Sequence, residues 1–298
     1  MFRTNIKTTK NLINMNHKSI EFKFPDPKIR NKIIFFNKGF SNKKRILEYN
    51  ENLKGWTQEH TSLHEDIGNG NHPIDIFSRS NLIKNISKNI KKKQFLEIGC
   101  SSGYLIKDLK TKFKYINYVG ADVLKLSLLK LSEKWKEVPF LKFDITKNPL
   151  KNIKFDYIIM LNVLEHIKDD FLAIKNTFKL LNKNGIVYIE VPAHQFLYDD
   201  YDKQLFHFRR YSIVDLEKKL VKAGYKIIKK QHLGFFCFIP FAITKIINKL
   251  FSKNKSSIKN KIKISNNLLV KFLFYLEEKF SNFYYPFGIR CFVIAKKL

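Results

Sequence analysis

Small, acidic and amide side chains recur at the ends of short apolar runs, at a spacing that suits the binding of a nucleoside. The first run ends in a turn that carries Glu97, Gly99 and Gly103. Glycine there can take positive φ angles and lets a ligand approach the backbone, while the helix that follows presents free N–H groups. Asp122 and Asp144 end the next two runs. One carboxylate can accept both hydroxyls of a ribose and the other can accept from the exocyclic amine of an adenine, so the pattern predicts a site for an adenosine-bearing ligand.

Three histidines lie near the ends of later runs and are candidates for a general base. Residues 162–166 follow the fourth run, read Asn-Val-Leu-Glu-His and end in His166. His194 follows the fifth run, and His207 lies in the segment after it. Imidazole is the usual base for a hydroxyl acceptor, because it titrates near neutral pH. The structural alternative for His166 is a residue that begins a helix and shapes the pocket.

Arg209 and Arg210 form a candidate contact to an anionic acceptor. A guanidinium group matches phosphate and carboxylate oxygens with a planar fork of donors. The alternative is a salt bridge within the protein, to one of the acids in the preceding segment: Asp199, Asp200 or Asp202.

Other nucleotide and metal sites fit the sequence poorly. A dinucleotide fingerprint, G-x-G-x-x-G, would need glycine where Ser101 and Tyr104 stand, and no G-K-[ST] follows for a phosphate loop. The three cysteines form no C-x-x-C pair, which disfavours a disulfide scaffold or thiolate zinc site and favours a reducing compartment. His60, His64 and His72 suggest metal ligation, but the glycines and proline among them argue against one helix face. No metal site is predicted.

The apolar runs alternate with helical segments. Strands are predicted over 94–98, 118–121, 138–143, 155–160, 186–191, 225–230 and 289–295. One helix is predicted over 169–181, ended by Asn184 and Gly185, and another begins at Ser212, which has capping-box spacing to Asp215. This alternation predicts an α/β fold, an open parallel sheet with helices on both faces. Ligands bind such sheets beyond the carboxyl ends of the strands, where the residues above converge.

These strand ends resemble the class I S-adenosylmethionine-dependent methyltransferases over about 94–230. Residues 97–103 are similar to the family's first motif, E/D-x-G-x-G-x-G, with Ser101 at the middle glycine. Asp122 and Asp144 match the acids that hold the ribose and face the adenine. The resemblance implies a Rossmann-like open sheet of about seven strands, mostly parallel with an antiparallel last strand, and S-adenosyl-L-methionine as cofactor. The cofactor-binding residues that it implies are Glu97, Gly99, Cys100, Ser101, Gly103, Asp122, Val123, Asp144, Ile145 and Asn162.

A narrower resemblance follows the fifth strand. Residues 191–194, Val-Pro-Ala-His, and 207–212, His-Phe-Arg-Arg-Tyr-Ser, look like a bacterial methyltransferase subgroup associated with cell-envelope polysaccharide or lipid-linked sugar pathways. The resemblance implies a small-molecule or lipid-linked acceptor, sugar or quinone-like, methylated at oxygen. Arg209, Arg210 and Tyr211 are the expected substrate contacts, and His166, His194 and His207 the expected catalytic residues.

Two other functions remain alternatives. The net charge of +30, from 56 basic and 26 acidic residues, suggests a nucleic-acid methyltransferase. However, residues 162–166 do not read N/D-P-P-Y/F, as in the amino-methylating nucleic-acid members, and no RNA-binding module is recognisable before the core. Nucleic acid is therefore not the expected partner. A non-catalytic protein that binds S-adenosylmethionine is the second alternative, which the intact motifs disfavour.

The positive charge is concentrated toward the end of the chain. Residues 218–276 contain 14 lysines and no acid, and apolar runs over 233–243 and 268–276 flank the densest lysines. Such a pattern is typical of a segment that lies on an anionic membrane. The alternative is that these runs pack on the core or on a partner copy. No run reaches the ~20 apolar residues of a membrane span. We expect a cytoplasmic protein with peripheral contact to the inner face of the membrane.

The chain is predicted to have four regions. Residues 1–50 are a tail or peripheral segment, of which 1–20 form either a loose tail or a targeting segment. Residues 51–232 form the methyltransferase core, in which 56–77 cover the cofactor. Residues 233–285 form a helical, basic and aromatic insertion, and 286–298 the closing strand. The sequence does not indicate an oligomeric state.

Overall fold

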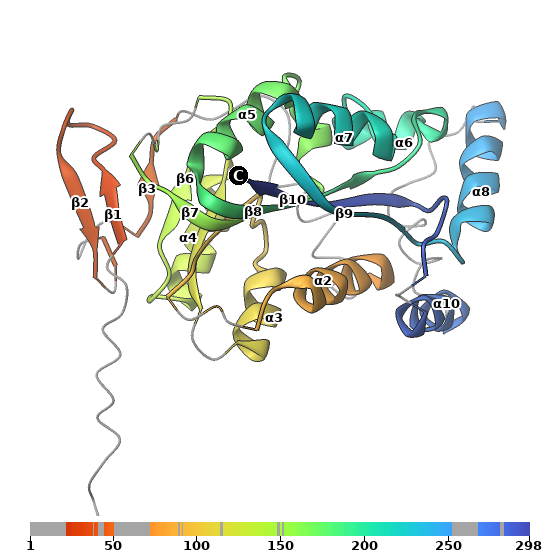
Figure 1. The fold of residues 1–298 in the computed structure, drawn as a ribbon, viewed down its shortest axis with the longest axis horizontal. Helices are drawn as coiled ribbons and strands as arrows, with labels where there is room; N and C mark the ends of the chain where they lie inside the picture. Colours follow the sequence, from red (N-terminus) through yellow and green to blue (C-terminus); the bar gives the residue numbers. More distant parts are fainter. Residues whose placement is uncertain are drawn as a thin grey trace, which may run out of the picture.

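A mixed β-sheet with helices on both faces organises the chain (Figure 1). The computed structural model describes residues 22–37, 39–40, 45–50, 72–88, 90, 92–113, 116–147, 150, 152–251, 268–280 and 283–298. The histidines His60 and His64 and most of the predicted cofactor cover lie outside these residues.

The sheet has eight strands in the order β3-β6-β5-β4-β7-β8-β10-β9. All neighbouring pairs from β3 to β8 are parallel, whereas β10 is antiparallel to both β8 and β9. The predicted Rossmann-like sheet, mostly parallel with an antiparallel last strand, is confirmed. The strands are β3 Leu47–Glu48, β4 Gln94–Ile98, β5 Asn117–Asp122, β6 Phe140–Lys142, β7 Phe155–Leu161, β8 Leu181–Pro192, β9 Tyr225–Leu233 and β10 Arg290–Lys297.

The eighth strand comes from residues 1–50, the region that we predicted to be a tail or peripheral segment. β3 pairs in parallel with β6 at the edge of the sheet, with Leu47 opposite Leu141. A hairpin of β1 (Phe22–Pro25) and β2 (Ile33–Phe36) precedes it and buries Phe24 and Phe36 in the core. The short apolar runs here lack clear periodicity, so only their burial against the sheet reveals them as strands.

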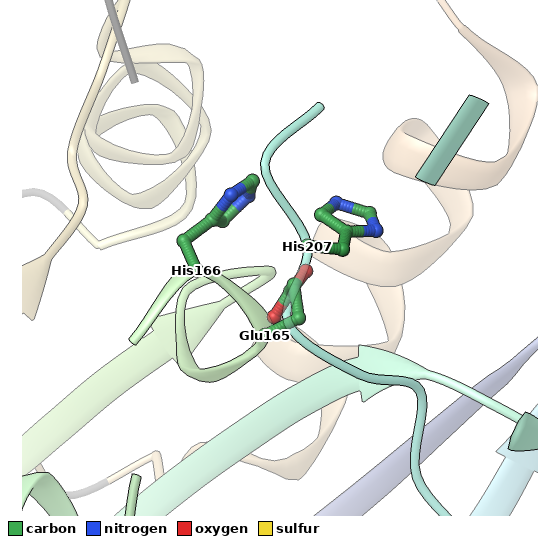
Figure 2. A group of neighbouring side chains, drawn as sticks. All are labelled: Glu165, His166 and His207. Carbon is green, nitrogen blue, oxygen red and sulfur yellow. The ribbon is translucent and has the colours of Figure 1, made fainter. Parts of the chain in front are cut away.

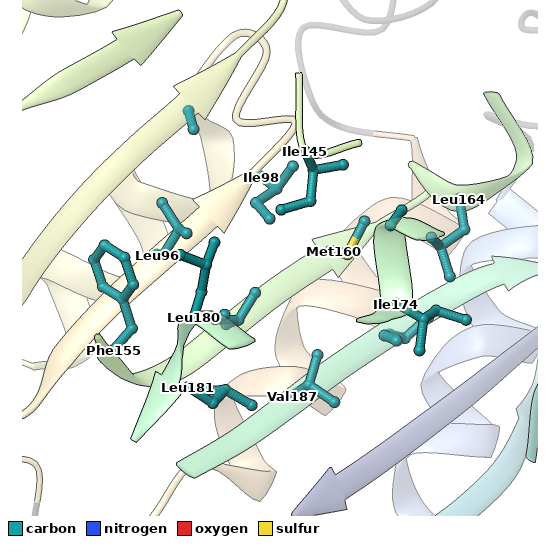
Figure 3. Packing of buried hydrophobic residues seen from close by; sticks show 14 of the residues in the cluster. Leu96, Ile98, Ile145, Phe155, Met160, Leu164, Ile174, Leu180, Leu181 and Val187 are labelled. Carbon is teal, nitrogen blue, oxygen red and sulfur yellow. The ribbon is translucent and has the colours of Figure 1, made fainter. Parts of the chain in front are cut away.

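Two hydrophobic layers hold the helices on the sheet. On one face, α5 (Asp170–Leu180) and α7 (Ile213–Lys222) cover a cluster that includes Leu96, Met160 and Val187 (Figure 3). The other face carries α2, α3 and α4. Burying one such aliphatic side chain contributes roughly 1.5–3 kcal/mol, so these layers are a main source of stability. The other helices of the described residues are α2 Pro73–Asn85, α3 Tyr104–Lys112, α4 Lys125–Lys134, α6 Asp200–Gln204, α8 Phe238–Phe251 and α10 Leu268–Lys279, with single turns η2 Leu164–His166 and η3 Gln195–Leu197.

Local signals set some boundaries well and others poorly. Ser212 caps α7, because its hydroxyl accepts from the Asp215 N–H at 3.0 Å, as predicted. The predicted helix stop at Asn184 was wrong: α5 ends at Leu180 and β8 begins at Leu181. Asn184 does take a left-handed φ of 64°, but inside an irregular stretch of the β7–β8 pairing. A residue that favours a positive φ can end a helix or widen a strand, and the sequence does not distinguish these.

In the described part of the basic, aromatic insertion, the helices α8 and α10 lie toward the β9 end of the sheet (Figure 1). Phe274 of α10 packs on Phe77 of α2, with ring centroids 5.6 Å apart. Among the helices that the structure describes, none combines the length and hydropathy of a membrane span. Residues 252–267, which carry many of the lysines, lie outside the described part of the chain.

Candidate cofactor and acceptor site

The turn after β4 depends on glycine at two positions. Gly99 has a φ of 78°, and a Cβ there would stand 2.5 Å from Cγ2 of Val163. Gly103 has a φ of 75° and would meet Leu131 and Trp135. The Gly99 contact brings the turn after β4 against the loop after β7. The two loops that the sequence predicted to share a site are therefore in contact.

Asp122 holds the turn from the end of β5. Its carboxylate accepts from the N–H of Ser101 and from the N–H of Leu124, both at 2.9 Å. The side chain is buried, and this burial raises the pKa of Asp122 although the backbone donors oppose the shift. Each carboxylate oxygen retains further acceptor capacity, as a ribose diol requires.

Three other predicted cofactor residues lie in or beside this turn. The carboxylate of Glu97 is buried and accepts from the hydroxyl of Tyr118. Cys100 is also buried. The hydroxyl of Ser101 is buried without a hydrogen-bond partner among the described residues, which leaves it available to a ligand.

The predicted adenine side of the site is built from the next strand ends. One oxygen of Asp144 accepts from both the N–H and the hydroxyl of Thr146, at 2.8 and 2.7 Å. Asn50, from the end of β3, accepts from the N–H of Asp144 at 2.8 Å. Ile145 is buried, whereas Val123 remains partly exposed. Asn50 was not predicted, because it belongs to the edge strand that the sequence did not reveal.

Asn162 continues this row of strand ends. It takes a left-handed φ of 53°, and its N–H donates to the carbonyl of Glu190 on β8 at 2.9 Å. The loop after β7 is thereby fixed to the neighbouring strand.

The side chains of Glu165, His166 and His207 lie close together beyond the carboxyl end of β7 (Figure 2). The rings of His166 and His207 meet edge to face, with centroids 4.7 Å apart. The N–H of Phe208 donates to the carbonyl of Glu165 at 2.7 Å, which fixes the segment after α6 on η2. Two of the three predicted histidines thus share one cluster although they are distant in sequence.

Glu165 is the most unusual member of the cluster. Its side chain is 1% exposed, and among the described residues neither carboxylate oxygen has a hydrogen-bond partner. This burial raises the pKa of Glu165 to about 8. A carboxyl group with so perturbed a pKa next to two histidines is typical of functional sites.

Asp202 on α6 bonds to three side chains beside the cluster. It pairs with Nδ1 of His207 at 2.9 Å, with Nε of Arg210 at 2.9 Å and with Nζ of Lys245 at 2.8 Å. Burial alone would raise the pKa of Asp202, but the bonds from His207 and Arg210 lower it far below the usual range. Asp202 is therefore a carboxylate, and Nδ1 of His207 must be the donor.

The predicted substrate contacts bind the protein itself in this structure. Arg210 pairs with Asp202, which was the salt-bridge alternative, and is 7% exposed. Arg209 donates to the carbonyls of Ile167 and Lys168, at 3.0 and 2.7 Å. The hydroxyl of Tyr211 donates to Asp170 at 2.8 Å. Arg209 and Tyr211 thus fasten the segment before α7 to the loop after β7, whereas Arg210 fastens it to α6 and to the carbonyl of Ala193, at 3.2 Å.

His194 lies in a separate group. Its ring stacks on His232 of β9 with centroids 5.5 Å apart, and its edge meets Phe238 of α8. Burial lowers the pKa of His194. The structure therefore does not place His194 in the cluster of Glu165, His166 and His207, and its predicted catalytic role stays a prediction.

Several polar residues of the site were missed from the sequence. Arg290 at the start of β10 pairs with Glu190 at 2.7 Å, beneath the loop after β7. Arg290 also pairs with Asp75 of α2 at 2.5 Å. Glu190, an acid inside the apolar run of β8, could have indicated this pair from the sequence. A charge on a strand with helices on both faces needs a buried partner of opposite charge.

Comparison with known proteins identifies the family. A family model described as a methyltransferase domain matches residues 77–230, about half of the chain. The chain belongs to the class I S-adenosylmethionine-dependent methyltransferase family. S-adenosylmethionine is its cofactor.

Relatives of this methyltransferase differ in their acceptors. It is 29% identical over 167 residues to the ubiquinone biosynthesis O-methyltransferase of Pelagibacter ubique, an alignment that covers 50% of this chain and 64% of that protein. It is 36% identical over 107 residues to the tRNA U34 carboxymethyltransferase of Campylobacter fetus subsp. fetus, covering 34% of this chain and 37% of that one. The chain spans less than two thirds of the length of both relatives.

Solved structures share the fold of this methyltransferase. The phosphoethanolamine N-methyltransferase 2 of Haemonchus contortus, in complex with S-adenosyl-L-methionine, has a TM-score of 0.53 at 15% identity, covering 81% of this chain and 57% of that chain. An S-adenosylmethionine-dependent methyltransferase from Archaeoglobus fulgidus has a TM-score of 0.52 at 15% identity, covering 78% of this chain and all of that chain.

The residues present fit the cofactor of this methyltransferase. Gly99 and Gly103 leave room where any Cβ would collide with neighbouring side chains, Asp122 offers a buried carboxylate, and Ser101 offers a buried hydroxyl with no partner among the described residues. These groups line the turn between β4 and α3. We expect them to hold the cofactor there.

Proposed function

We propose that the chain transfers the methyl group of S-adenosylmethionine to a hydroxyl oxygen of a small or lipid-linked acceptor. The cofactor, when bound, supplies a methyl on a sulfonium: its C–S bond breaks as the O–C bond forms, and the electron pair stays on sulfur. The acceptor's proton passes to a base or to water. In this proposal the turn of 99–103 and Asp122 orient the donor, and the loop after β7 and its histidines face the acceptor.

The observation that carries the lipid-linked acceptor is the position of α8. Lys245 on the inner side of α8 donates to Asp199 and Asp202, and Asp202 holds His207. An insertion with an apolar outer face is thereby bonded to the acceptor cluster itself. If the outer face of α8 lies on a membrane, an acceptor embedded in that membrane would have a short path to His207.

The outer faces of α8 and α10 support a membrane as the partner. On α8 the exposed apolar residues recur at helical spacing, with Ile239 62% and Ile243 52% exposed, followed by Ile246 and Ile247. On α10 Leu268, Phe272 and Tyr275 repeat this pattern. Amphipathic helices of this kind, joined by a lysine-rich segment, suit the surface of an anionic bilayer. We propose that the protein contacts such a surface peripherally.

The relatives support the choice of atom but differ in acceptor. The relative from Pelagibacter ubique is named an O-methyltransferase of ubiquinone biosynthesis, which supports an oxygen acceptor of quinone-like chemistry. The tRNA-modifying relative and the net charge of +30 favour RNA as the second candidate. A protein that only binds S-adenosylmethionine is the third.

Transfer of a labelled methyl group distinguishes these candidates. The full chain is incubated with methyl-labelled S-adenosylmethionine and, in parallel, with a bacterial lipid extract, with quinone-pathway phenols and with total tRNA. Label in the lipid or phenol fraction, absent with Asp122→Ala, is the expected result. Label that enters only tRNA would replace this proposal with the second candidate, and cofactor binding without any transfer would replace it with the third.

A further inference from the structure

The cluster of Glu165, His166 and His207 has the composition of a metal site. One carboxylate and two imidazoles place their candidate ligand atoms within 4.8 Å of one another (Figure 2). Ligands about 2.1 Å from one ion stand no more than ~4.2 Å apart, so shifts below an ångström would complete the site. Because neither oxygen of the buried Glu165 has a hydrogen-bond partner among the described residues, a cation would satisfy a carboxylate that otherwise lacks one.

His207 is already oriented as a ligand. Asp202 accepts from Nδ1 of His207 at 2.9 Å, so the lone pair of the neutral ring lies on Nε2. Metal-ligating histidines commonly donate their other ring N–H to a carboxylate in this way. Asp202 is in turn fixed by Arg210 and Lys245, so it acts here as a positioning residue rather than a ligand.

The charges around the cluster favour a divalent cation. Cationic side chains nearby are each paired with acids: Arg210 and Lys245 with Asp202, and Arg290 with Glu190 and Asp75. Lys245 also pairs with Asp199. These ion pairs and Glu165 together hold five carboxylates against three cations. When all are ionised, two negative charges remain.

We propose that Glu165, His166 and His207 bind a divalent transition-metal cation of the zinc, cobalt or manganese kind. Imidazole nitrogens disfavour magnesium and calcium, which prefer oxygen ligands. Three protein ligands leave coordination positions open, as in catalytic sites. Resting on the proposed function, we assign one open position to the acceptor hydroxyl, which on the cation loses its proton to water more readily and becomes a better nucleophile.

Metal binding is tested on the full chain without cofactor or acceptor. The protein is stripped with chelator, titrated with Co²⁺ and followed by visible absorption, and its Zn²⁺ content is measured after dialysis. We expect one ion per chain. Glu165→Gln should weaken binding at least about 100-fold, and Asp202→Asn about 10–100-fold, because it loosens the orientation of His207.

His232→Asn is the matched control, because His232 is a buried histidine that lies outside the cluster. This variant should keep full metal binding. If Glu165→Gln does not fold, the more exposed His166→Asn takes its place. The metal site would be overturned if the protein holds no stoichiometric ion. It would also be overturned if metal binding is unchanged in both Asp202→Asn and Glu165→Gln, or its replacement His166→Asn. Since no methyl transfer is measured, this failure is separate from that of the proposed function.

Discussion

The ammonium of Lys245, on α8, lies 2.8 Å from Oδ2 of Asp202, and both side chains are buried. Asp202 also accepts from His207 and Arg210. One carboxylate therefore joins the inner face of the basic insertion to the cluster of Glu165, His166 and His207. Lys245 lies in the lysine-rich region of 218–276, yet its ammonium is buried and bonds α8 to this cluster through Asp202.

Removing this lysine should destabilise α8 and the cluster together. Breaking one partner of a buried ion pair commonly costs about 3–5 kcal/mol, because it leaves the other charge uncompensated. We expect Lys245→Met to lower the thermal midpoint and to speed amide exchange in α8. Lys249→Met, an exposed lysine on the same helix, is the control and should change neither. Equal effects of the two substitutions would show that Lys245 is not a structural link.

Asp122 should control cofactor affinity. Asp122→Ala removes the carboxylate that accepts from the N–H groups of Ser101 and Leu124. It also removes the two oxygens that we expect to bind the ribose hydroxyls. Hydrogen bonds to a charged group contribute roughly 1.5–3 kcal/mol, so calorimetry with S-adenosylmethionine should show at least about tenfold weaker binding. Glu133→Ala, at an exposed position of α4, should bind as the unmodified protein does. Unchanged affinity in Asp122→Ala would disprove the pocket assignment.

Gly99 should be more sensitive to a methyl group than another glycine with a positive φ. Gly99→Ala combines an unfavourable backbone conformation, costing about 1–2 kcal/mol, with a Cβ placed 2.5 Å from Val163. At Gly39, with a φ of 123°, an added Cβ meets nothing within 4 Å. Chemical denaturation should therefore show a larger loss for Gly99→Ala than for Gly39→Ala. Adding Val163→Ala to Gly99→Ala should recover part of the difference; recovery of none would locate the cost in the backbone alone.

Glu277 should make stability depend on pH. Its carboxylate accepts from the N–H of Gly234 at 2.8 Å, and burial raises the pKa of Glu277 to about 7. Because the folded pKa exceeds the unfolded one, the contribution of this group is complete below about pH 4.5 and is lost as the pH rises through about 7. The loss amounts to about 3 kcal/mol at the usual conversion.

Glu277→Gln should remove this contribution to the pH dependence. Urea denaturation should measure the free energy of unfolding of both proteins. The value for the variant minus that for the unmodified protein should be larger at about pH 8 than at about pH 5. The neighbouring Glu278 provides the control, because Lys84 lowers the pKa of Glu278 and the contribution of that group is therefore complete above about pH 4.5. The difference in stability between Glu278→Gln and the unmodified protein should stay the same at about pH 5 and about pH 8. Parallel pH profiles for the unmodified protein and Glu277→Gln would contradict the prediction.

Membrane binding should depend on the outer faces of the insertion. Ile243→Glu and Phe272→Glu each place a charge in an exposed apolar row, so flotation with anionic vesicles should show at least about tenfold weaker binding for the pair. Binding should also fall from about 10 to about 150 mM salt, as the Debye length shortens from ~30 to ~8 Å. Ile228→Glu, at an exposed position of β9, is the control. Equal retention of all variants would rule out this surface.

Much of the fold followed from local patterns. The sequence predicted the strands β4, β5 and β7 and the glycine turn at Gly99. A buried parallel strand and a strained turn each restrict the residue types that fit, so both leave a local pattern. The edge strand β3 and the start of β8 could not be predicted from the sequence. A two-residue edge strand carries no periodicity, and Asn184 suits either a helix end or an irregular strand.

For the site, the sequence by itself determined the row of strand ends: Gly99, Asp122, Asp144 and residues 162–166. Parallel strands bring their carboxyl ends to one edge, so one-dimensional spacing was enough. Only the tertiary structure decided that His207 would join His166 while His194 would not, and that Lys245 would pair with Asp202. Such pairings between distant segments depend on how helices and loops pack on the sheet, and a buried charge accepts only the partner that this packing places within reach.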